Sequence, residues 1–426
     1  MRDSFPRYLG SCLHGASFFL LASLFLLSSC ASYTEQTEAV HSSFVQSRYD
    51  DALATLEASE IKEQSRNALL YMLEKAMILD RMGQLKSSRK LLLDASKLAD
   101  ELYTKSVSKE IATYLVSEDQ TEYPGEDFEK VAIHTFLALS FLEEGLLSEA
   151  RVEARKINNK IAEMNQTYEE NPNKYSEDGF AWLLSAVIYE AKGEWDDAII
   201  DYEKALKAYQ GKFSKFSQGV PESLVVGYAN VATIRNRADR LKDLKTSFPK
   251  VFQKYSFPLT TKSTFFIAET GAVARKVSES FMLPINNQVV RYSWPVIRTG
   301  YSRSPPQVQI PGQSPVFGEA IDFSEIGRET LEDKRTRYTL KSIARLIAKS
   351  KITDAADRNF GPLGGLLANI IMASTETADT RSWTLLPQSI YVARVQSERE
   401  LDSYQIRLES KKMVPSSGKI NFVRIK

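Results

Sequence analysis

The chain is poor in the residues that build metal sites, disulfides and most nucleophilic active sites. Its 426 residues include two cysteines and three histidines. Cys12 lies in an N-terminal segment that we expect to be removed, so the mature chain keeps Cys30 alone and has no partner for an internal disulfide. With His41 and His134 as its histidines, the mature chain lacks the ligand sets of common zinc sites, and we expect no metal and no cofactor.

Common catalytic motifs are missing as well. The sequence contains no H-E-x-x-H, no G-x-S-x-G and no phosphate-binding G-x-x-x-x-G-K followed by Ser or Thr. We therefore predict a protein that is not an enzyme. A carboxylate-dependent enzyme acting on glycans or peptides is the alternative, because a sequence does not give the distances between its acidic side chains.

Neither sign of charge dominates. The chain has 55 Lys and Arg residues and 54 Asp and Glu residues. Removing residues 1–29 removes Arg2, Arg7 and Asp3 and leaves 53 of each sign. Such a balance gives no general attraction to nucleic acid or to anionic lipid. We expect no nucleic-acid partner, and membrane association has to come from the N-terminus.

The first 30 residues have the pattern of a bacterial export signal. Arg2 and Arg7 precede the apolar run Ala16–Leu27, whose 12 residues are too few for a ~30 Å hydrocarbon core that needs roughly 20. Length and flanks therefore predict a signal peptide over residues 1–29 rather than a membrane helix. The run ends in Leu27-Ser28-Ser29-Cys30, which resembles the lipobox of bacterial lipoproteins.

This resemblance implies that Cys30 is acylated. A diacyl group and an N-acyl chain such as palmitate would anchor the mature protein stably at a membrane surface, which a single chain does not do. Ala31 stands where an Asp commonly retains lipoproteins in the inner membrane, which favours the outer membrane. Residues 30–43 are expected to form a lipidated tether. An ordinary signal peptide with a chance cysteine is the alternative.

Residues 44–250 are predicted to form helical repeats. The clearest unit resembles a tetratricopeptide repeat, in which two antiparallel helices pack with small residues at their crossing and aromatic residues around it. Gly193 falls at the turn between the helices, where the backbone needs freedom. The residues that match the family spacing are Trp182, Ala186, Tyr189, Gly193, Ala198, Tyr202 and Ala205.

Two earlier units resemble degraded copies of this repeat. The matching positions are Ala138, Phe141, Gly145 and Ala150, and before them Ala76, Leu79, Gly83 and Ser88. The units start 62 and 48 residues apart, against ~34 in a simple array, so insertions are expected near Tyr103–Asp127 and Asn165–Asp178. Phe44–Leu56 is expected to form half a repeat, and Leu224–Leu244 a closing helix pair.

Stacked repeats form a concave face that commonly binds a peptide or a helix. We therefore predict a membrane-anchored adaptor that binds other envelope proteins through its repeats. The alternative is that this face is filled by the insertions or by the C-terminal half of the chain itself.

After Pro249, prolines, glycines and short alternating runs replace the helical pattern. Two helices are predicted, a long charged one over Ile326–Arg358 and a buried apolar one over Leu363–Met372, whose ten residues are too few to span a membrane. The fold class is therefore helical repeats followed by an α+β domain over residues 256–426 with a largely antiparallel sheet. The runs that predict strands are Phe265–Ala268, Val289–Ile297, Gln307–Ile310, Ile390–Val395, Tyr404–Leu408 and Ile420–Ile425.

The long charged helix has a stripe of cations four residues apart: Arg337, Lys341, Arg345 and Lys349. This basic stripe suits contact with lipid headgroups, an anionic wall polymer or an acidic partner. A solvated face is the favoured interpretation, because acidic residues bracket the stripe.

The stretch Asp379-Thr380-Arg381-Ser382-Trp383, followed by Leu385-Leu386-Pro387, resembles the C-terminal signature of an uncharacterised family of bacterial envelope lipoproteins with tetratricopeptide-like N-terminal halves. The resemblance implies an envelope protein, with a link to cell-wall synthesis, and brings no established activity. Asp379 and Arg381 can form charge-assisted hydrogen bonds, and Arg381 can stack on Trp383. This chemistry suits either a carboxylate or glycan ligand or a buried structural clamp, and we favour the clamp.

Overall fold

The computed structural model describes residues 32–109, 118–167, 175–258, 262–285, 288–298, 300, 304–310, 314–335, 358, 378–397, 403–406, 409–412 and 420–426. The predicted signal peptide, Cys30, the basic stripe and the apolar segment Leu363–Met372 lie outside the described residues. Of the predicted helix Ile326–Arg358, residues 326–335 and 358 are described, and residues 326–335 are part of a helix that begins at residue 323.

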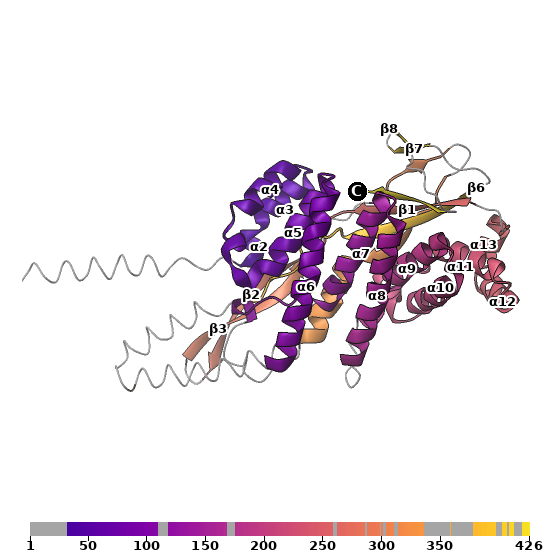
Figure 1. The fold of residues 1–426 in the computed structure, drawn as a ribbon. Coiled ribbons are helices and arrows are strands. Elements are labelled where there is room, and N and C mark those ends of the chain that lie inside the picture. Colours follow the sequence, from indigo (N-terminus) through magenta and orange to yellow (C-terminus); the bar gives the residue numbers. More distant parts are fainter. Residues whose placement is uncertain are drawn as a thin grey trace, which may run out of the picture.

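Five pairs of consecutive helices stack along the described part of the chain, which confirms the tetratricopeptide-like organisation (Figure 1). Shorter helices, α2 (Tyr33–Gln36) and α13 (Pro249–Lys254), stand at the two ends of the stack. The pairs are α3 (Glu38–Val45) with α4 (Tyr49–Glu57), α5 (Ala68–Arg81) with α6 (Leu85–Lys109), α7 (Asp127–Glu143) with α8 (Leu147–Thr167), α9 (Gly179–Lys192) with α10 (Trp195–Gln210), and α11 (Glu222–Ile234) with α12 (Ala238–Ser247).

Each turn within a pair has one residue in the left-handed region. Three are the predicted glycines, Gly83, Gly145 and Gly193, with φ of 75°, 73° and 76°. The other two are Ser47 and Asn236, with φ of 61° and 51°. In every case the next N–H donates to a carbonyl five residues back, as Glu194 does to Tyr189. Because Ser47 and Asn236 are not glycines, the glycine pattern alone missed these two turns. Asn adopts this conformation more readily than most side chains.

The small residues of the repeat pattern lie in the core. Ala186 on α9 and Ala198 on α10 are fully buried, and the equivalent Ala76, Ala138 and Ala150 are buried as well. Tyr189, Tyr202 and Ala205 are also buried, whereas Trp182 is partly buried. The long spacing between units is explained in part by helix length, since α6 has 25 residues and α8 has 21, against 16 in α10.

The expected tether over residues 30–43 is wrong for its described part. Residues 33–36 and 38–45 are helical, and Tyr33, Thr37 and Val40 are buried. Ser32 and Glu35 form a capping box that starts α2, a helix signal within a segment whose polar composition suggested a linker. The first repeat is consequently a full helix pair rather than half of one.

The second half contains a four-stranded sheet in the order β5-β6-β1-β9. Strands β5 (Gly318–Asp322) and β1 (Lys262–Thr270) run antiparallel to β6 (Ser389–Ser397), and β9 (Ile420–Ile425) runs parallel to β1. A long hairpin joins β2 (Arg275–Ile285) to β3 (Gln288–Arg298). A small sheet pairs β4 (Val308–Gln309), β7 (Ser403–Ile406) and β8 (Glu409–Lys412).

All six predicted strands coincide with observed ones, and the predicted α+β class with a mainly antiparallel sheet is confirmed. Strands β2, β5 and β8 were not predicted. Their sequences are interrupted by charges or by glycine and proline, as in Arg275-Lys276 and Glu409-Ser410-Lys411-Lys412, so they lack the alternation that marks a half-buried strand.

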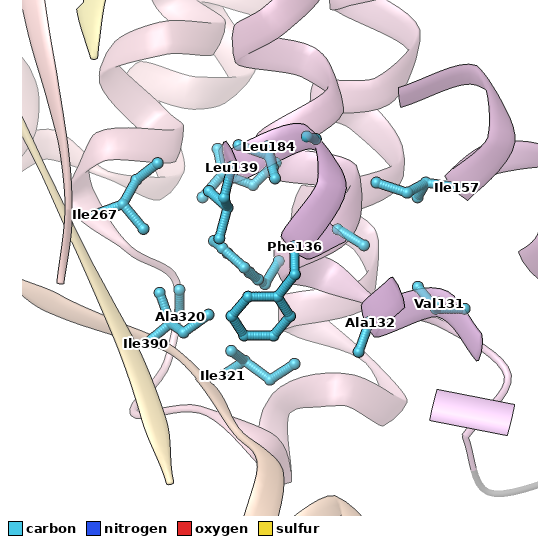
Figure 2. Close-up of a cluster of buried hydrophobic side chains, with 14 of the residues drawn as sticks. Val131, Ala132, Phe136, Leu139, Ile157, Leu184, Ile267, Ala320, Ile321 and Ile390 are labelled. Atoms are coloured by element: carbon cyan, nitrogen blue, oxygen red, sulfur yellow. The ribbon is translucent and has the colours of Figure 1, made fainter. Parts of the chain in front are cut away.

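The first helices of the pairs, α5, α7, α9 and α11, form a face opposite their partner helices that we call the inner face. The sheet packs on this face, with α7 against β9, α9 against β5 and α11 against β6. Every residue from Asp127 to Ser140 of α7 is therefore buried. Figure 2 shows the ring of Phe136 beside Ile321 of β5, with Ala320 and Ile390 on the strand side.

The two predicted domains, 44–250 and 256–426, consequently share one continuous hydrophobic core. A smaller cluster lies on the other side of the sheet, formed by Phe266, Val308, Ile310, Ala393, Val395 and Val423. The chain therefore does not divide into two bodies that each bury a core of their own.

The packing of small residues gives a direct test of the repeat register. Ala186→Leu should lower the free energy of unfolding by ~1–3 kcal/mol, because the larger side chain overpacks a fully buried site. Lys207→Ala, on an exposed position of the neighbouring helix α10, is the control and should have little effect. Chemical denaturation of both variants measures the difference, and equal stabilities would contradict the register.

Candidate functional site

The inner face of the repeats is where a binding groove is expected, and a segment of the chain itself occupies it. This signature segment comprises residues 379–387. Backbone N–H groups of this segment are bound by two glutamates of the first helices. Trp383 N–H donates to Glu129 Oε1 at 2.7 Å, and Thr384 N–H donates to Glu74 Oε1 at 2.7 Å. Leu385 N–H donates to Glu74 Oε2 at 3.0 Å. The alternative in which the C-terminal half fills the groove is therefore the observed one.

Glu74 on α5 contacts two other parts of the chain, helix α2 and the signature segment. Besides the two backbone donors it accepts from the hydroxyls of Thr384 (2.8 Å) and Tyr33 (3.1 Å), the latter at the start of the described chain. Burial raises the pKa of Glu74 to about 7, although these donors oppose the shift by favouring the carboxylate. The N-terminal helix and the signature segment are thus held by one buried side chain.

Glu129 on α7 makes a second set of contacts with the signature segment. Its Oε2 accepts from the Tyr123 hydroxyl (2.8 Å) and from the N–H of Glu126 (2.9 Å), while Oε1 accepts from Trp383. Burial, and then the charge of Glu126, raise the pKa of Glu129. Both oxygens of this carboxylate are therefore engaged by donors of the protein.

Asp379 and Arg381 form a bidentate ion pair. Arg381 Nε donates to Asp379 Oδ1 at 2.9 Å, and Nη2 donates to Oδ2 at 2.8 Å. Its Nη1 donates to the carbonyl of Thr121 at 2.6 Å, and Arg381 is 3% exposed. Burial by itself raises the pKa of Asp379, but the guanidinium outweighs it and holds the pKa below its ordinary value. The pair fastens the segment to the loop that precedes α7.

Arg381 stacks on a different ring from that of Trp383, which the sequence offered as a possible partner. The guanidinium lies over the ring of Tyr123, 5.2 Å from its centroid. Trp383 is 1% exposed and packs against Phe136 of α7, with ring centroids 5.8 Å apart. The side chains of residues 381 and 383 thus serve different contacts, which a two-residue spacing in sequence does not reveal.

A small cavity lies beside Trp383. The charged residues in its wall are Glu126, Glu129 and Lys276. Lys276 Nζ donates to Glu126 Oε1 at 2.8 Å, and Lys334 also pairs with Glu126. Burial raises the pKa of Glu126, but these two lysines outweigh it and hold the pKa well below its usual range. Within the part of the chain that the structure describes, three atoms in the cavity wall have no hydrogen-bond partner: Thr330 Oγ1, Ser382 Oγ and Trp383 Nε1. They can hold a water or a small polar group.

Two further buried arginines tie the sheet to the repeats. Arg394 of β6 pairs with Glu190 of α9 through both terminal nitrogens, at 2.6 and 2.8 Å. The Tyr202 hydroxyl donates to the same carboxylate at 2.5 Å, so this repeat aromatic has a polar role in addition to packing. Arg424 of β9 pairs with Asp80 of α5 at 2.8 Å.

Sequence reasoning identified Asp379, Arg381 and Trp383 but missed the buried acids of the first half that contact the second half of the chain. The missed residues are Glu74, Asp80, Glu126, Glu129 and Glu190. A signal was present, since Glu74, Asp80 and Glu190 interrupt apolar helix stretches, as in Leu69-Leu70-Tyr71-Met72-Leu73-Glu74. Acids seldom lie at such positions unless they are paired.

No group of three or more His, Cys, Asp or Glu side chains in the described ranges is placed to hold a metal ion. None of the described helices has the length and the apolar character needed to cross a membrane.

No family model matches the chain, and no curated protein matches it. Solved structures with helical repeats are similar to about half of it. MamA of AMB-1 is 14% identical, with 52% of this chain and 92% of that chain covered and a TM-score of 0.31. A putative kinesin light chain of Podospora anserina with nearly identical TPR-like repeats is 14% identical, with 51% and 94% covered and a TM-score of 0.32. The TPR2AB domain of yeast Sti1 in its pHSP90 complex is 14% identical, with 51% of this chain and 93% of that chain covered and a TM-score of 0.15.

The ion pair of the signature segment predicts a specific pattern of stabilities. Arg381→Ala should lower the free energy of unfolding of the full chain by up to ~3–5 kcal/mol, because Asp379, whose side chain is 20% exposed, loses its charge partner. Asp379→Asn should also lower the free energy of unfolding. The double variant should lower it by less than the sum of the two single effects, because both charges are then absent and neither is left unpaired. Denaturant titrations of the four proteins measure this cycle, and single variants as stable as the wild type would rule out the clamp.

The raised pKa of Glu74 predicts a pH dependence of stability. A carboxyl whose pKa is about 7 when folded and near 4.5 when unfolded holds more protons in the folded state between these values. The contribution of Glu74 to the free energy of unfolding is therefore greatest below pH 4.5, and it falls by up to about 3 kcal/mol as the pH rises through 7. Glu74→Gln removes this titration, so the stability of the wild type relative to this variant should fall between pH 5 and 8. Parallel curves for the two proteins would contradict the prediction.

Proposed function

We propose that this protein is a lipid-anchored adaptor of the bacterial cell envelope, in which the helical repeats are an internal scaffold and outer surfaces bind partner proteins. The observation that carries the proposal is the filled inner face. The surface on which stacked repeats commonly bind a ligand is covered by the sheet and by the signature segment. A partner protein therefore meets another surface of the chain.

The anchor is supported by the sequence and by the start of the fold. The Leu27-Ser28-Ser29-Cys30 motif closes the apolar run, and Ser32, two residues later, caps helix α2. Acyl chains on Cys30 would therefore hold the body within ~10 Å of the membrane surface, given at most ~3.6 Å per residue. Ala31 favours the outer membrane. A link to wall synthesis is part of the proposal and comes from the resemblance of the signature segment alone.

The outer surface of the repeats offers a place for a partner protein. Val152 on α8 and Ile200 on α10 are 48% and 49% exposed, and each stands two residues after the buried alanine of its repeat, Ala150 or Ala198. Equivalent positions in successive repeats point to the same side of the stack. Apolar side chains repeated on one exposed side suit contact with a protein.

The carboxylates beside the cavity give little support to the alternative function, a carboxylate-dependent enzyme. A general base needs an oxygen that can reach the proton of a substrate. Glu126 is paired with two lysines, and the oxygens of Glu129 accept three hydrogen bonds from the protein. These contacts suit structural roles.

Two measurements test the proposed function. Cys30→Ala should abolish fatty-acid labelling and leave the precursor unprocessed, because the acyl acceptor is gone; normal labelling would contradict the anchor. In the lipidated chain, a photo-crosslinking residue in place of Ile200 should capture an envelope protein in intact cells, whereas the same residue in place of Lys245, an exposed polar position on α12, should not. Equal capture at both positions, or none, would contradict an adaptor that uses this surface.

A further inference from the structure

The cavity beside Trp383 lies where the signature segment meets the helix that begins at residue 323. Ser382 and Trp383 of the segment are in its wall, together with Gly327 and Thr330 of the helix. A volume of about 20 Å³ is open to a molecule the size of water. One water needs ~10–15 Å³ of such space, so the cavity admits about one molecule of this size.

The wall of this cavity has polar atoms that the described residues do not satisfy. They are Thr330 Oγ1, Ser382 Oγ and Trp383 Nε1. Trp383 is 1% exposed and Thr330 is 4% exposed. Polar atoms buried in this way nearly always bond the protein or an ordered water. The number of atoms agrees with a water, because a buried water typically makes about three hydrogen bonds.

The three atoms restrict the chemistry of a ligand in this cavity. The indole N–H can only donate, whereas each hydroxyl can donate or accept, so the ligand must accept a hydrogen bond. A metal ion or an ammonium ion cannot accept one. Lys276 Nζ already donates to Glu126 Oε1 at 2.8 Å and to the carbonyl of Arg381 at 3.1 Å, so the cation in the wall does not call for an anion. A neutral molecule with one heavy atom that both accepts and donates meets these restrictions.

We propose that this cavity binds one water molecule, which accepts a hydrogen bond from Trp383 Nε1–H and bonds the hydroxyls of Ser382 and Thr330. The water joins the signature segment to the helix over residues 323–335. Without it, an N–H group and two hydroxyls would be unpaired where these two elements meet, and each would lower the stability of the fold. The site is independent of the proposed anchor and of the adaptor function.

Gly327→Ala tests the site by filling it. Gly327 lies within the helix, and a Cβ atom placed on it meets no other atom within 4 Å. In a helix interior this substitution ordinarily stabilises. Here the methyl group takes the place of the water and leaves the three polar atoms unpaired, so we expect the denaturation midpoint of the full chain to fall. A midpoint that rises would overturn the proposal.

Thr330→Val removes one partner of the water and keeps the shape of the side chain. Loss of a bonded hydroxyl lowers the denaturation midpoint, whereas loss of an unbonded buried hydroxyl raises it. The matched control is Thr135→Val, because Thr135 is a buried helix residue whose hydroxyl donates to the carbonyl of Val131 at 3.1 Å. We expect both midpoints to fall. A rise for Thr330→Val alone contradicts the bound water, whether or not Gly327→Ala folds.

Nuclear magnetic resonance of the full mature chain reads the site directly. The chain has four tryptophans, and the indole N–H signal of Trp383 is the one that Trp383→Phe removes. We expect a nuclear Overhauser cross-peak between this N–H and water, and its loss in Gly327→Ala, which keeps both hydroxyls. A cross-peak that survives in Gly327→Ala comes from the hydroxyl protons and overturns the proposal, as does the lack of a cross-peak in the wild type.

Discussion

Carboxylates buried on the inner helices have to be satisfied by the second half of the chain, and the rest of the structure depends on this constraint. Glu74 and Glu129 accept backbone N–H groups of the signature segment, while Glu190 and Asp80 pair with arginines of β6 and β9. A buried carboxylate without such donors is costly. Because three successive first helices carry one or more of these acids, the sheet can dock in one register only.

The apolar surface of the repeats leads to the same arrangement. In α7 and α9 nearly every residue is buried, because their partner helices cover one side and the sheet covers the other. A helix that is apolar on all sides needs cover on all sides. The two halves therefore form one cooperative unit, and what would be a peptide-binding face in an open repeat array is part of the core here.

The difference between local and long-range information explains what the sequence predicted. The helix pairs followed from alanine and glycine spacing, as at Ala186 and Gly193, because a helical hairpin is specified within about 20 residues. The strand positions followed from local alternation. The filling of the inner face did not follow from any local pattern, because Glu74 lies 310 residues from Thr384 in the sequence. The aromatic partner of Arg381 is Tyr123, more than 250 residues away, and no spacing rule connects the two.

Helix α2, which follows the predicted anchor, is connected to two features of the second half, the signature segment and the β2–β3 hairpin. Tyr33 bonds Glu74, which also holds the signature segment, and Thr34 bonds the root of the β2–β3 hairpin. Tyr33 and Thr34 are both buried, so this helix is part of the core rather than a flexible leader. The first described helix is therefore joined by one hydrogen bond to Glu74, which holds the signature segment, and by another to the β2–β3 hairpin. A short tether, which the polar composition of residues 32–43 suggested, would not make these contacts.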